Sequence, residues 1–364
     1  MALAIVLIVM VVGSVIFHFW SPWWFTPLAS NWGSMDNTII FTFWVTGFVF
    51  VAVNLFVAYC CIKFRHSPDR RAAYEPENHK LETWLTGLTS LGVFAMLAPG
   101  LIVYNQFIQV PKDAVIFEAL GHQWQWSFRL PGKDGALGKA DNRHVSFDNP
   151  MGVDPDDPWG QDDIIVVGEP VHVLVDQPMR VNLRSKDVLH NMYVPQWRAK
   201  MDAVPGLVSY FWLTPTVTGP FEVLCAELCG VGHYNMRSKV IVDNETDYKK
   251  WLSTQRTFAE TQGGEAPGGD PAERGEQLAK QHGCLARHSL DGARGVGPTW
   301  KGMYGSTETL TDGSTVTVDD AYLRESITDP NAKLVEGYPP VMAAYPMSDD
   351  DLDALLAYFM TLAE

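Results

Sequence analysis

The chain has 364 residues, which is enough for two or three domains. Its formal net charge is −15 at pH 7, which excludes nucleic acid as an expected partner and would instead attract a basic soluble protein. The five cysteines are odd in number and have no regular spacing, which argues against a disulfide-based scaffold.

Three long apolar segments occupy the first third of the chain, at residues 2–19, 37–62 and 84–108. Each is close to the length that an α-helix needs to cross a bilayer. The first segment could instead be a cleavable signal peptide, but no Lys or Arg precedes residue 63 and no small-residue cleavage site follows. We therefore expect a retained helix. Aromatic residues that suit a membrane–water interface come after it: Trp20, Trp23, Trp24 and Phe25.

Charge predicts the orientation of these segments. By the positive-inside rule, the basic end of the second segment faces the cytoplasm, so the N-terminus is also cytoplasmic and the chain is outside after residue 108. Glu82 comes just before the third segment, where a carboxylate is either an ordinary interfacial group or a functional one. The basic residues that follow the second segment are Lys63, Arg65, Arg70 and Arg71.

From residue 113 onward the pattern changes from helical to strand-like. Short runs rich in β-branched residues are separated by turn signals, which predicts a β-sandwich or barrel. Residues 131–163 are rich in Gly, Asp and Pro and indicate an insertion between two strands. The expected strands are 114–119, 164–167, 171–175, 181–183, 208–213, 221–224 and 238–242.

A group of sulfur and imidazole side chains follows one of these strands. Cys225, Cys229, His233 and Met236 lie in one short loop, and His190 lies upstream. Soft donors of this kind favour copper, and a thioether at this spacing is not a usual zinc ligand. Two thiolates could each bridge two metal ions. The alternative is a Cys225–Cys229 disulfide, with the histidine and methionine as ordinary loop residues.

This loop, together with the distant His190, resembles the dinuclear copper (CuA) loop of subunit II of cytochrome c oxidase. The resemblance extends to the segments 121–126 and 200–206 and covers roughly residues 35–255. It implies a cupredoxin-like β-sandwich over residues 109–251. The membrane helices, 1–108, would form a separate N-terminal region.

The resemblance implies a role for each side chain of the loop. Cys225 and Cys229 would bridge two copper ions. His190 and His233 would each bind one of these ions, and Met236 would be a weak ligand to one of them. The loop would thus hold both metals with side chains from two distant segments.

Other positions acquire expected roles from the same resemblance. The backbone carbonyl of Glu227 would bind the second copper, and its carboxylate would reach a magnesium ion at the boundary with subunit I. Trp124 would be the surface point at which electrons enter. Glu82 would lie near the mouth of one proton path of subunit I. Asp187 and Asp202 are candidates for hydrogen bonds to the ligating histidines, and the sequence does not choose between them.

The end of the chain differs in composition from the β-rich part. Residues 252–272 are Gly-rich and polar, which predicts a flexible linker. Residues 273–364 resemble a small cytochrome c domain, with helices expected at 272–281 and 349–362. Ser348 is expected to cap the last helix, with Asp351 at the capping-box distance.

The motif for covalent haem is incomplete in this domain. Attachment normally needs C-x-x-C-H, and Arg287 stands at the second cysteine position. Cys284 alone would form a thioether, His288 would be the proximal iron ligand and Met342 the distal one. Either haem c is held in this way, or the domain keeps its fold without haem. The arginine would contact a haem propionate or simply fill space.

The resemblance implies an electron-accepting subunit of a haem-copper terminal oxidase. It would lie in a bacterial inner membrane, with its copper and cytochrome-like domains on the periplasmic side. Expected partners are subunit I, other oxidase subunits, membrane lipids and a donor cytochrome c. Electrons would pass from CuA to subunit I, which would reduce oxygen to water, so the enzyme label belongs to the complex.

Three other functions share parts of this pattern. A quinol-fed oxidase subunit has the fold but lacks the copper ligands. A membrane-anchored copper carrier or assembly factor would use Cys and Met without needing Trp124 or a cytochrome-like domain. A CuA component of a nitrogen-oxide reductase would share the copper site, although two membrane spans before the sandwich, with Glu82, favour the oxygen-reducing enzyme.

Overall fold

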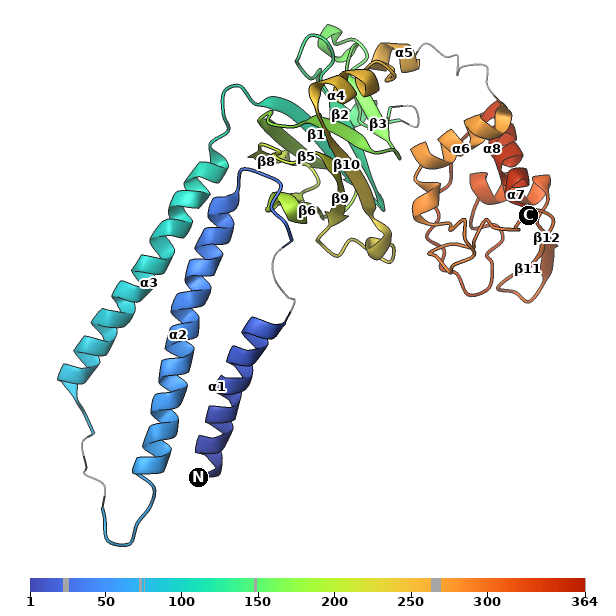
Figure 1. Cartoon of the computed structure of the whole chain (residues 1–364). Helices are drawn as coiled ribbons and strands as arrows, with labels where there is room; N and C mark the ends of the chain where they lie inside the picture. The colour runs from blue at the N-terminus through green and yellow to red at the C-terminus, as the bar shows by residue number, and fades with distance from the viewer. Residues whose placement is uncertain (22–25, 72–73, 75, 147–148, 263–269, 364) are drawn as a thin grey trace. The chain divides into compact units, whose positions relative to one another are not determined.

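Figure 1 shows a computed structural model of the chain. It describes residues 1–364 except 22–25, 72–73, 75, 147–148, 263–269 and 364. Three of the expected interfacial aromatics and the centre of the expected linker therefore lie outside the described residues. The chain divides into two compact units, one made of residues 1–110 with 196–198 and the other of residues 111–195 with 199–364.

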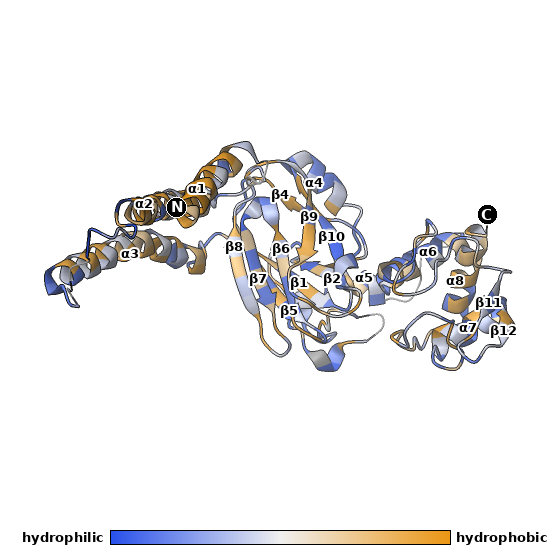
Figure 2. Cartoon of the chain, turned by 90° about the horizontal axis from the view of Figure 1, so that it is seen from below, coloured by the Kyte–Doolittle hydropathy of each residue, from blue (hydrophilic) through white to orange (hydrophobic). Residues whose placement is uncertain are grey.

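The first unit contains three helices long and apolar enough to cross a membrane: α1 (Ala2–Trp20), α2 (Gly33–Lys63) and α3 (His79–Ile108). Large apolar side chains are exposed along all three helices, and most of α1 and α2 is coloured as hydrophobic in Figure 2. The three predicted segments are thus confirmed as helices. The start of α3 was predicted too late, because the side chain of Asn78 accepts a hydrogen bond from the Leu81 N–H and caps a polar first turn. Glu82 lies inside that turn rather than before the helix.

The first unit also includes the short segment Gln196–Arg198. The Arg198 guanidinium pairs with Asp36 in the first turn of α2, with Nε 2.6 Å from Oδ1. The N–H of Ala29 donates to the Gln196 carbonyl at 2.8 Å, and the hydroxyl of Ser30 donates to the Trp197 carbonyl at 2.7 Å. These contacts fix the segment against the residues that lead into α2.

The second unit begins with two five-stranded sheets, which confirm the predicted β-sandwich (Figures 1 and 2). In each sheet one pair of strands is parallel, β1 with β5 and β4 with β10, and the other neighbouring pairs are antiparallel. The first sheet has the order β3 (Ile164–Val167), β2 (Gln125–Leu130), β1 (Val115–His122), β5 (Met179–Ser185) and β8 (Ser209–Leu213). The second has the order β4 (Val171–Leu174), β10 (Arg237–Asp243), β9 (Gly219–Cys225), β6 (His190–Val194) and β7 (Ala199–Ala203).

Strand periodicity explains the core of the sandwich. Along β5, Val181 and Leu183 are buried while Arg180, Asn182 and Arg184 alternate with them at partly exposed positions. This alternation identified β5 in the sequence.

Strand β2 was not predicted, although polar and apolar residues alternate along its sequence. All six of its residues are nevertheless buried. Burial of Arg129 is possible because its guanidinium pairs with Glu118 and with Asp163, the latter at 2.9 Å. Strands β6 and β7 were also missed. The insertion 131–163 does lie between β2 and β3, as expected, and the described part contains two short 3-10 turns, η1 (Asn142–His144) and η2 (Pro158–Gly160).

Helices complete the second unit. Two short ones, α4 (Glu245–Leu252) and α5 (Phe258–Gln262), follow β10. The first part of the segment 252–272 is therefore folded rather than flexible, because Phe258 is buried and its N–H donates to the Asp163 carbonyl at 2.7 Å. The C-terminal region contains α6 (Pro271–Gln281), η5 (Cys284–Ala286), a hairpin of β11 (Thr307–Thr309) and β12 (Thr315–Thr317), α7 (Asp320–Thr328) and α8 (Asp349–Thr361). Helix α6 packs closely on α8, since Gly275 leaves no room for a Cβ beside Ala354. Ser348 caps α8 by accepting the Asp351 N–H at 3.2 Å, as predicted.

Candidate metal centre

Strand pairing brings the predicted copper ligands together. His190 opens β6, Cys225 closes β9, and these two strands are antiparallel neighbours. Cys229, His233 and Met236 lie on the connection from β9 to β10, which turns through the short η4 (His233–Asn235). A loop held at both ends by adjacent strands has few ways to move its ligands apart.

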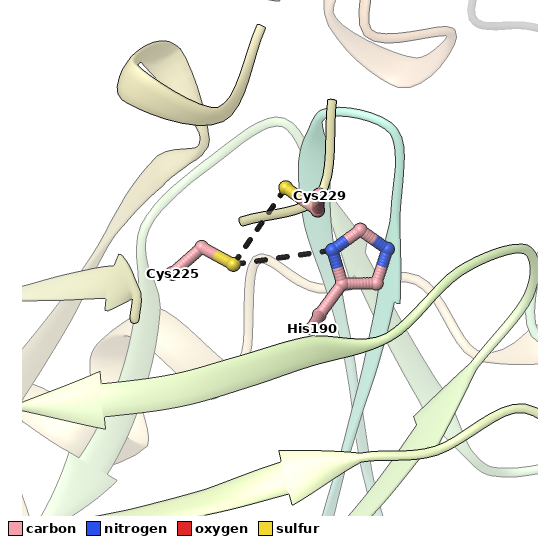
Figure 3. A group of neighbouring side chains, drawn as sticks. All are labelled: His190, Cys225 and Cys229. Carbon is pink, nitrogen blue, oxygen red and sulfur yellow. Dashed lines mark hydrogen bonds between the residues drawn. The ribbon is translucent and has the colours of Figure 1, made fainter. Parts of the chain in front are cut away.

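The sulfur atoms form the centre of the cluster, as Figure 3 shows for three of its members. The Sγ atoms of Cys225 and Cys229 are 3.8 Å apart. Nδ1 of His190 is 3.9 Å from the first sulfur, and Nδ1 of His233 is 3.5 Å from the second. Each thiol therefore faces its own imidazole.

Two weaker donors complete this arrangement. The Sδ atom of Met236 is 3.7 Å from the Cys229 sulfur, and the Glu227 carbonyl oxygen is 3.2 Å from the Cys225 sulfur. The two sulfurs and the four other atoms expected to bind copper thus lie in one cluster. The disulfide alternative does not describe this structure, because a disulfide bond needs about 2.05 Å between its sulfurs and all five cysteines are free.

A carboxylate orients the His190 ring. The imidazole is fully buried, and its Nε2 lies 2.8 Å from Oδ1 of Asp187, which leaves Nδ1 facing the thiols. Oδ2 of the same carboxylate accepts the Gln123 N–H at 2.7 Å. Burial alone would lower the pKa of His190, but hydrogen bonds to Asp187 and Cys225 raise it above its ordinary value. The second candidate, Asp202, instead accepts a hydrogen bond from Asn191 at 2.7 Å.

The two thiols differ in acidity. Burial opposes ionisation of both, but for Cys225 the hydrogen bonds with His190, Asn191, Glu227 and Cys229 together outweigh it and lower the pKa of that thiol. For Cys229, burial and the negative charge of Cys225 raise the pKa. Neighbouring sulfurs that share one site cannot both ionise without a cation, so the pair is suited to metals bound between them.

The side chain of Trp124 is buried next to the copper-ligand cluster. Its side chain is only 4% exposed, whereas a surface position was expected. The ring is covered because the Arg287 guanidinium lies over it, with Cζ 5.3 Å from the ring centroid, and because Gly232 packs against its face. Its Nε1–H donates to the Cys229 carbonyl at 3.1 Å. Trp126 is buried as well and meets the His190 ring edge-on, with centroids 6.1 Å apart.

Two further predicted residues stand apart from the cluster. Among the described residues, the one group of His, Cys, Asp and Glu with metal-ligand spacing is His190, Cys225 and Cys229, so no such group gathers around the Glu227 carboxylate. Glu82 is exposed on the first turn of α3, with Oε2 3.6 Å from Nδ1 of His79.

The C-terminal region has its own candidate site. Cys284, His288 and Met342 line one cavity between η5, α7, α8 and the loops that join them. The Nδ1 atom of His288 lies 2.8 Å from the Pro298 carbonyl, which leaves Nε2 as the free nitrogen, and the Trp300 ring stacks on the imidazole at 5.0 Å. Burial lowers the pKa of His288 to about 4, so the ring is neutral and able to bind iron. These donors fit a haem bound through one thioether.

Comparison with known proteins identifies both regions. Residues 115–244 match the family described as cytochrome c oxidase subunit II, periplasmic domain, and residues 272–363 match cytochrome c. The chain is 59% identical over 259 residues to the alternative cytochrome c oxidase subunit 2 of Bradyrhizobium diazoefficiens, a match over 71% of this chain and 94% of that relative. The chain belongs to the cytochrome c oxidase subunit II family.

Other members of the subunit II family are more distant. The cytochrome c oxidase subunit 2 of Alkalihalophilus pseudofirmus is 32% identical over 256 residues, which cover 70% of this chain and 63% of that relative. The solved periplasmic domain of subunit II from Bradyrhizobium japonicum is 28% identical and covers 40% of this chain and 96% of that chain, with a TM-score of 0.30. That score is too low to support a structural conclusion.

Membership confirms the predicted class of protein. The chain is subunit II of a haem-copper terminal oxidase, part of a complex with other subunits, and its β-sheet domain is periplasmic and anchored by membrane helices. The family implies a CuA-type copper site, and the C-terminal region implies haem c. Sequence reasoning did not foresee Gln123, whose Nε2 donates to the Cys229 carbonyl at 2.8 Å, because no local pattern marks a contact across so many residues.

Proposed function

We propose that this subunit accepts electrons from a cytochrome c at a dinuclear copper centre and passes them to subunit I, where oxygen is reduced to water. The observation that carries this proposal is the pair of free thiols 3.8 Å apart, each facing an imidazole and each with one weaker donor. When bound, such a copper pair supplies one-electron storage in a site that changes little between oxidation states. The net charge of −15 is suited to attracting a basic donor protein.

The contacts support a role for each donor. Cys225 and Cys229 would bridge the metals, because their sulfurs lie at the centre of the cluster. His190 and His233 would each bind one ion, since each ring nitrogen faces a thiol. The Glu227 carbonyl and the Met236 thioether would be the weaker ligands.

The protein's own contribution is to hold these donors in place before metal arrives. Asp187 fixes the tautomer and direction of the His190 ring, and burial keeps water from the Cys229 thiol. Trp124 and Gln123 both donate to the Cys229 carbonyl, which holds the loop against the neighbouring β-turn. We propose Trp124 as the residue next to which electrons arrive.

We also propose that the C-terminal region binds haem c through a single thioether at Cys284, with His288 and Met342 as the axial ligands. The three side chains line one cavity, which supports the proposal. The alternative of a cytochrome-type fold without haem predicts no covalently bound haem. Pyridine haemochrome analysis of the purified chain distinguishes the two: one thioether leaves one vinyl group conjugated, so the band should differ from that of a doubly attached haem. Absence of covalent haem would exclude attachment at Cys284.

Several finer assignments belong to the same proposal. The chain would comprise membrane helices at 1–108, a copper domain at 109–251, a linker at 252–272 and a cytochrome domain at 273–364, in line with the family matches. Glu227 would share magnesium with subunit I, and Glu82 would lie near a proton-path mouth of that subunit. The location would be a bacterial inner membrane, with lipid around the apolar helices.

The copper assignment is tested by removing one bridge at a time. In Cys225→Ser and in Cys229→Ser we expect the dinuclear site to be lost, because each thiolate would bind both ions. The measurements are copper per chain and the electron paramagnetic resonance signal of an electron shared by two copper nuclei. Leu228→Ala is the matched control, since Leu228 lies between the two cysteines but is 78% exposed. A shared two-copper signal in either serine variant would contradict the bridging assignment.

A further inference from the structure

Arg287 stands where the haem motif would have its second cysteine, yet its guanidinium reaches out of the cytochrome-type region. Nη2 donates to the carbonyl of Gln123, and Cζ lies 5.3 Å from the centroid of the Trp124 ring. Nη1 is 3.3 Å from both the Gly283 carbonyl and the Tyr345 hydroxyl. The guanidinium therefore connects the Cys284–His288 turn with the Gln123–Trp124 segment of the β-sheet domain.

The Gln123–Trp124 segment is itself bonded to the copper-ligand cluster at two points. Both side chains donate to the Cys229 carbonyl, at 2.8 and 3.1 Å. The N–H of Gln123 donates to Asp187, whose other oxygen pairs with His190. A group that fixes this segment is thus one contact away from residues on both sides of the proposed copper site.

Three other polar contacts join the same two regions. Asn235, in the copper loop, donates to the Ala286 carbonyl at 2.6 Å. Gln125 donates to the Lys280 carbonyl at 2.9 Å, and the ammonium of Lys280 lies 2.8 Å from Glu169. Arg287 differs from these because it combines a charge-assisted hydrogen bond with stacking on an indole, a combination that a planar guanidinium allows and an ammonium does not.

We propose that Arg287 is a positioning residue that docks the Cys284–His288 turn onto the Gln123–Trp124 segment. A cysteine at this position would form a thioether to the haem and would be too short to reach the other domain. Arginine at position 287 therefore provides a contact between domains in place of a second thioether. Both partners belong to one chain, which gives the contact a high effective concentration, so a small polar surface suffices. This proposal rests on the proposed function only in naming the two cofactors as copper and haem, since the docking contact itself involves protein groups alone.

Hydrogen–deuterium exchange of the full-length protein tests this docking. In Arg287→Gln we expect the amides of residues 120–126 to exchange about tenfold faster, the factor expected for the loss of one net hydrogen bond. Arg287→Lys, which keeps the charge but not the planar fork, should restore part of the protection. Arg294→Gln is the matched control, because Arg294 donates to the Gly337 carbonyl and lies over Tyr338 within the C-terminal region. It should leave residues 120–126 unchanged.

Haem and copper content are measured on the same samples. If Arg287→Gln loses haem, Arg287→Cys provides the second test, because it restores C-x-x-C-H and still lacks the guanidinium. Exchange in residues 120–126 must then rise in the cysteine variant with its haem retained. Unchanged exchange in both variants would overturn the docking role. Wild-type protein without copper or haem would instead contradict the proposed function, while the exchange comparison could still be made.

Discussion

At the residue scale, the copper ligands were predictable and their support was not. Cys225, Cys229 and Met236 stand out because soft donors at short spacing in one loop are rare in ordinary sequences. The partner of His190 could not be chosen from sequence, since Asp187 and Asp202 are both plausible until strand β6 is placed. The structure gives Asp187 the contact with Nε2 because the turn before β6 brings its carboxylate within hydrogen-bonding distance of the ring.

The role of Asp187 can be measured as copper affinity. Asp187→Ala should weaken binding by about 10–100-fold, the usual cost of removing the hydrogen-bond partner of a ligating histidine. Asp187→Asn should lose less, because its amide oxygen still accepts a hydrogen bond from the imidazole. Affinity is measured by competition with a copper chelator. Glu222→Ala is the control, an exposed carboxylate on the strand that carries Cys225. Wild-type affinity in Asp187→Ala would remove this residue from the site.

At the element scale, alternation of polar and apolar residues was present in strands that were found and in strands that were missed. Strand β5 was found, and its polar positions are partly exposed as alternation predicts. Strand β2 alternates too but was missed, and its polar residues, including Arg129, are buried, which alternation does not predict. That arginine is tolerated in the core only through long-range partners, Glu118 on β1 and Asp163 beside β3, and no local rule reveals such pairing.

The buried carboxyl of Asp163 predicts a pH dependence of folding. Burial raises its pKa to about 7 although Arg129 opposes the shift, whereas the ordinary value is 3.8. Between these values the folded protein keeps a proton that the unfolded chain has released. The contribution of Asp163 to stability is therefore fully present below about pH 4 and is lost as the pH rises to about 7.

Asp163→Asn should remove this slope, because asparagine has no proton to lose. The difference between wild type and Asp163→Asn in free energy of unfolding of the β-sheet domain, followed by denaturant titration of the full-length protein, should move in favour of the variant from pH 5 to pH 8. Asp156→Asn serves as the control, because Asp156 is an exposed acid of the same insertion. A difference that stays constant over this range would show that Asp163 is ionised in the folded protein at both ends.

At the scale of the whole molecule, sequence patterns located the three apolar helices, the β-sandwich and the helical C-terminal region. What they could not supply was the contact between regions, such as that of Arg287 with Trp124, because side chains far apart in sequence carry no shared period. Membrane orientation, in contrast, can be predicted from the sequence. It depends on the charges beside each span, which the sequence shows directly.

The orientation of the helices in the membrane can therefore be tested directly. The basic residues after α2 should hold that end in the cytoplasm, so alkaline phosphatase fused after Arg71 should be inactive in cells, whereas fusion after Lys112 should be active. Changing Lys63, Arg65, Arg70 and Arg71 together to Gln should raise the activity of the first fusion, because the charge bias that fixes the loop is lost. Changing the same four residues to Glu should raise it to a similar level, because the orientation follows positive charge rather than net charge. Full activity of the unaltered Arg71 fusion would place this loop outside the membrane and, with α3 crossing once, would put the copper-ligand domain on the wrong side.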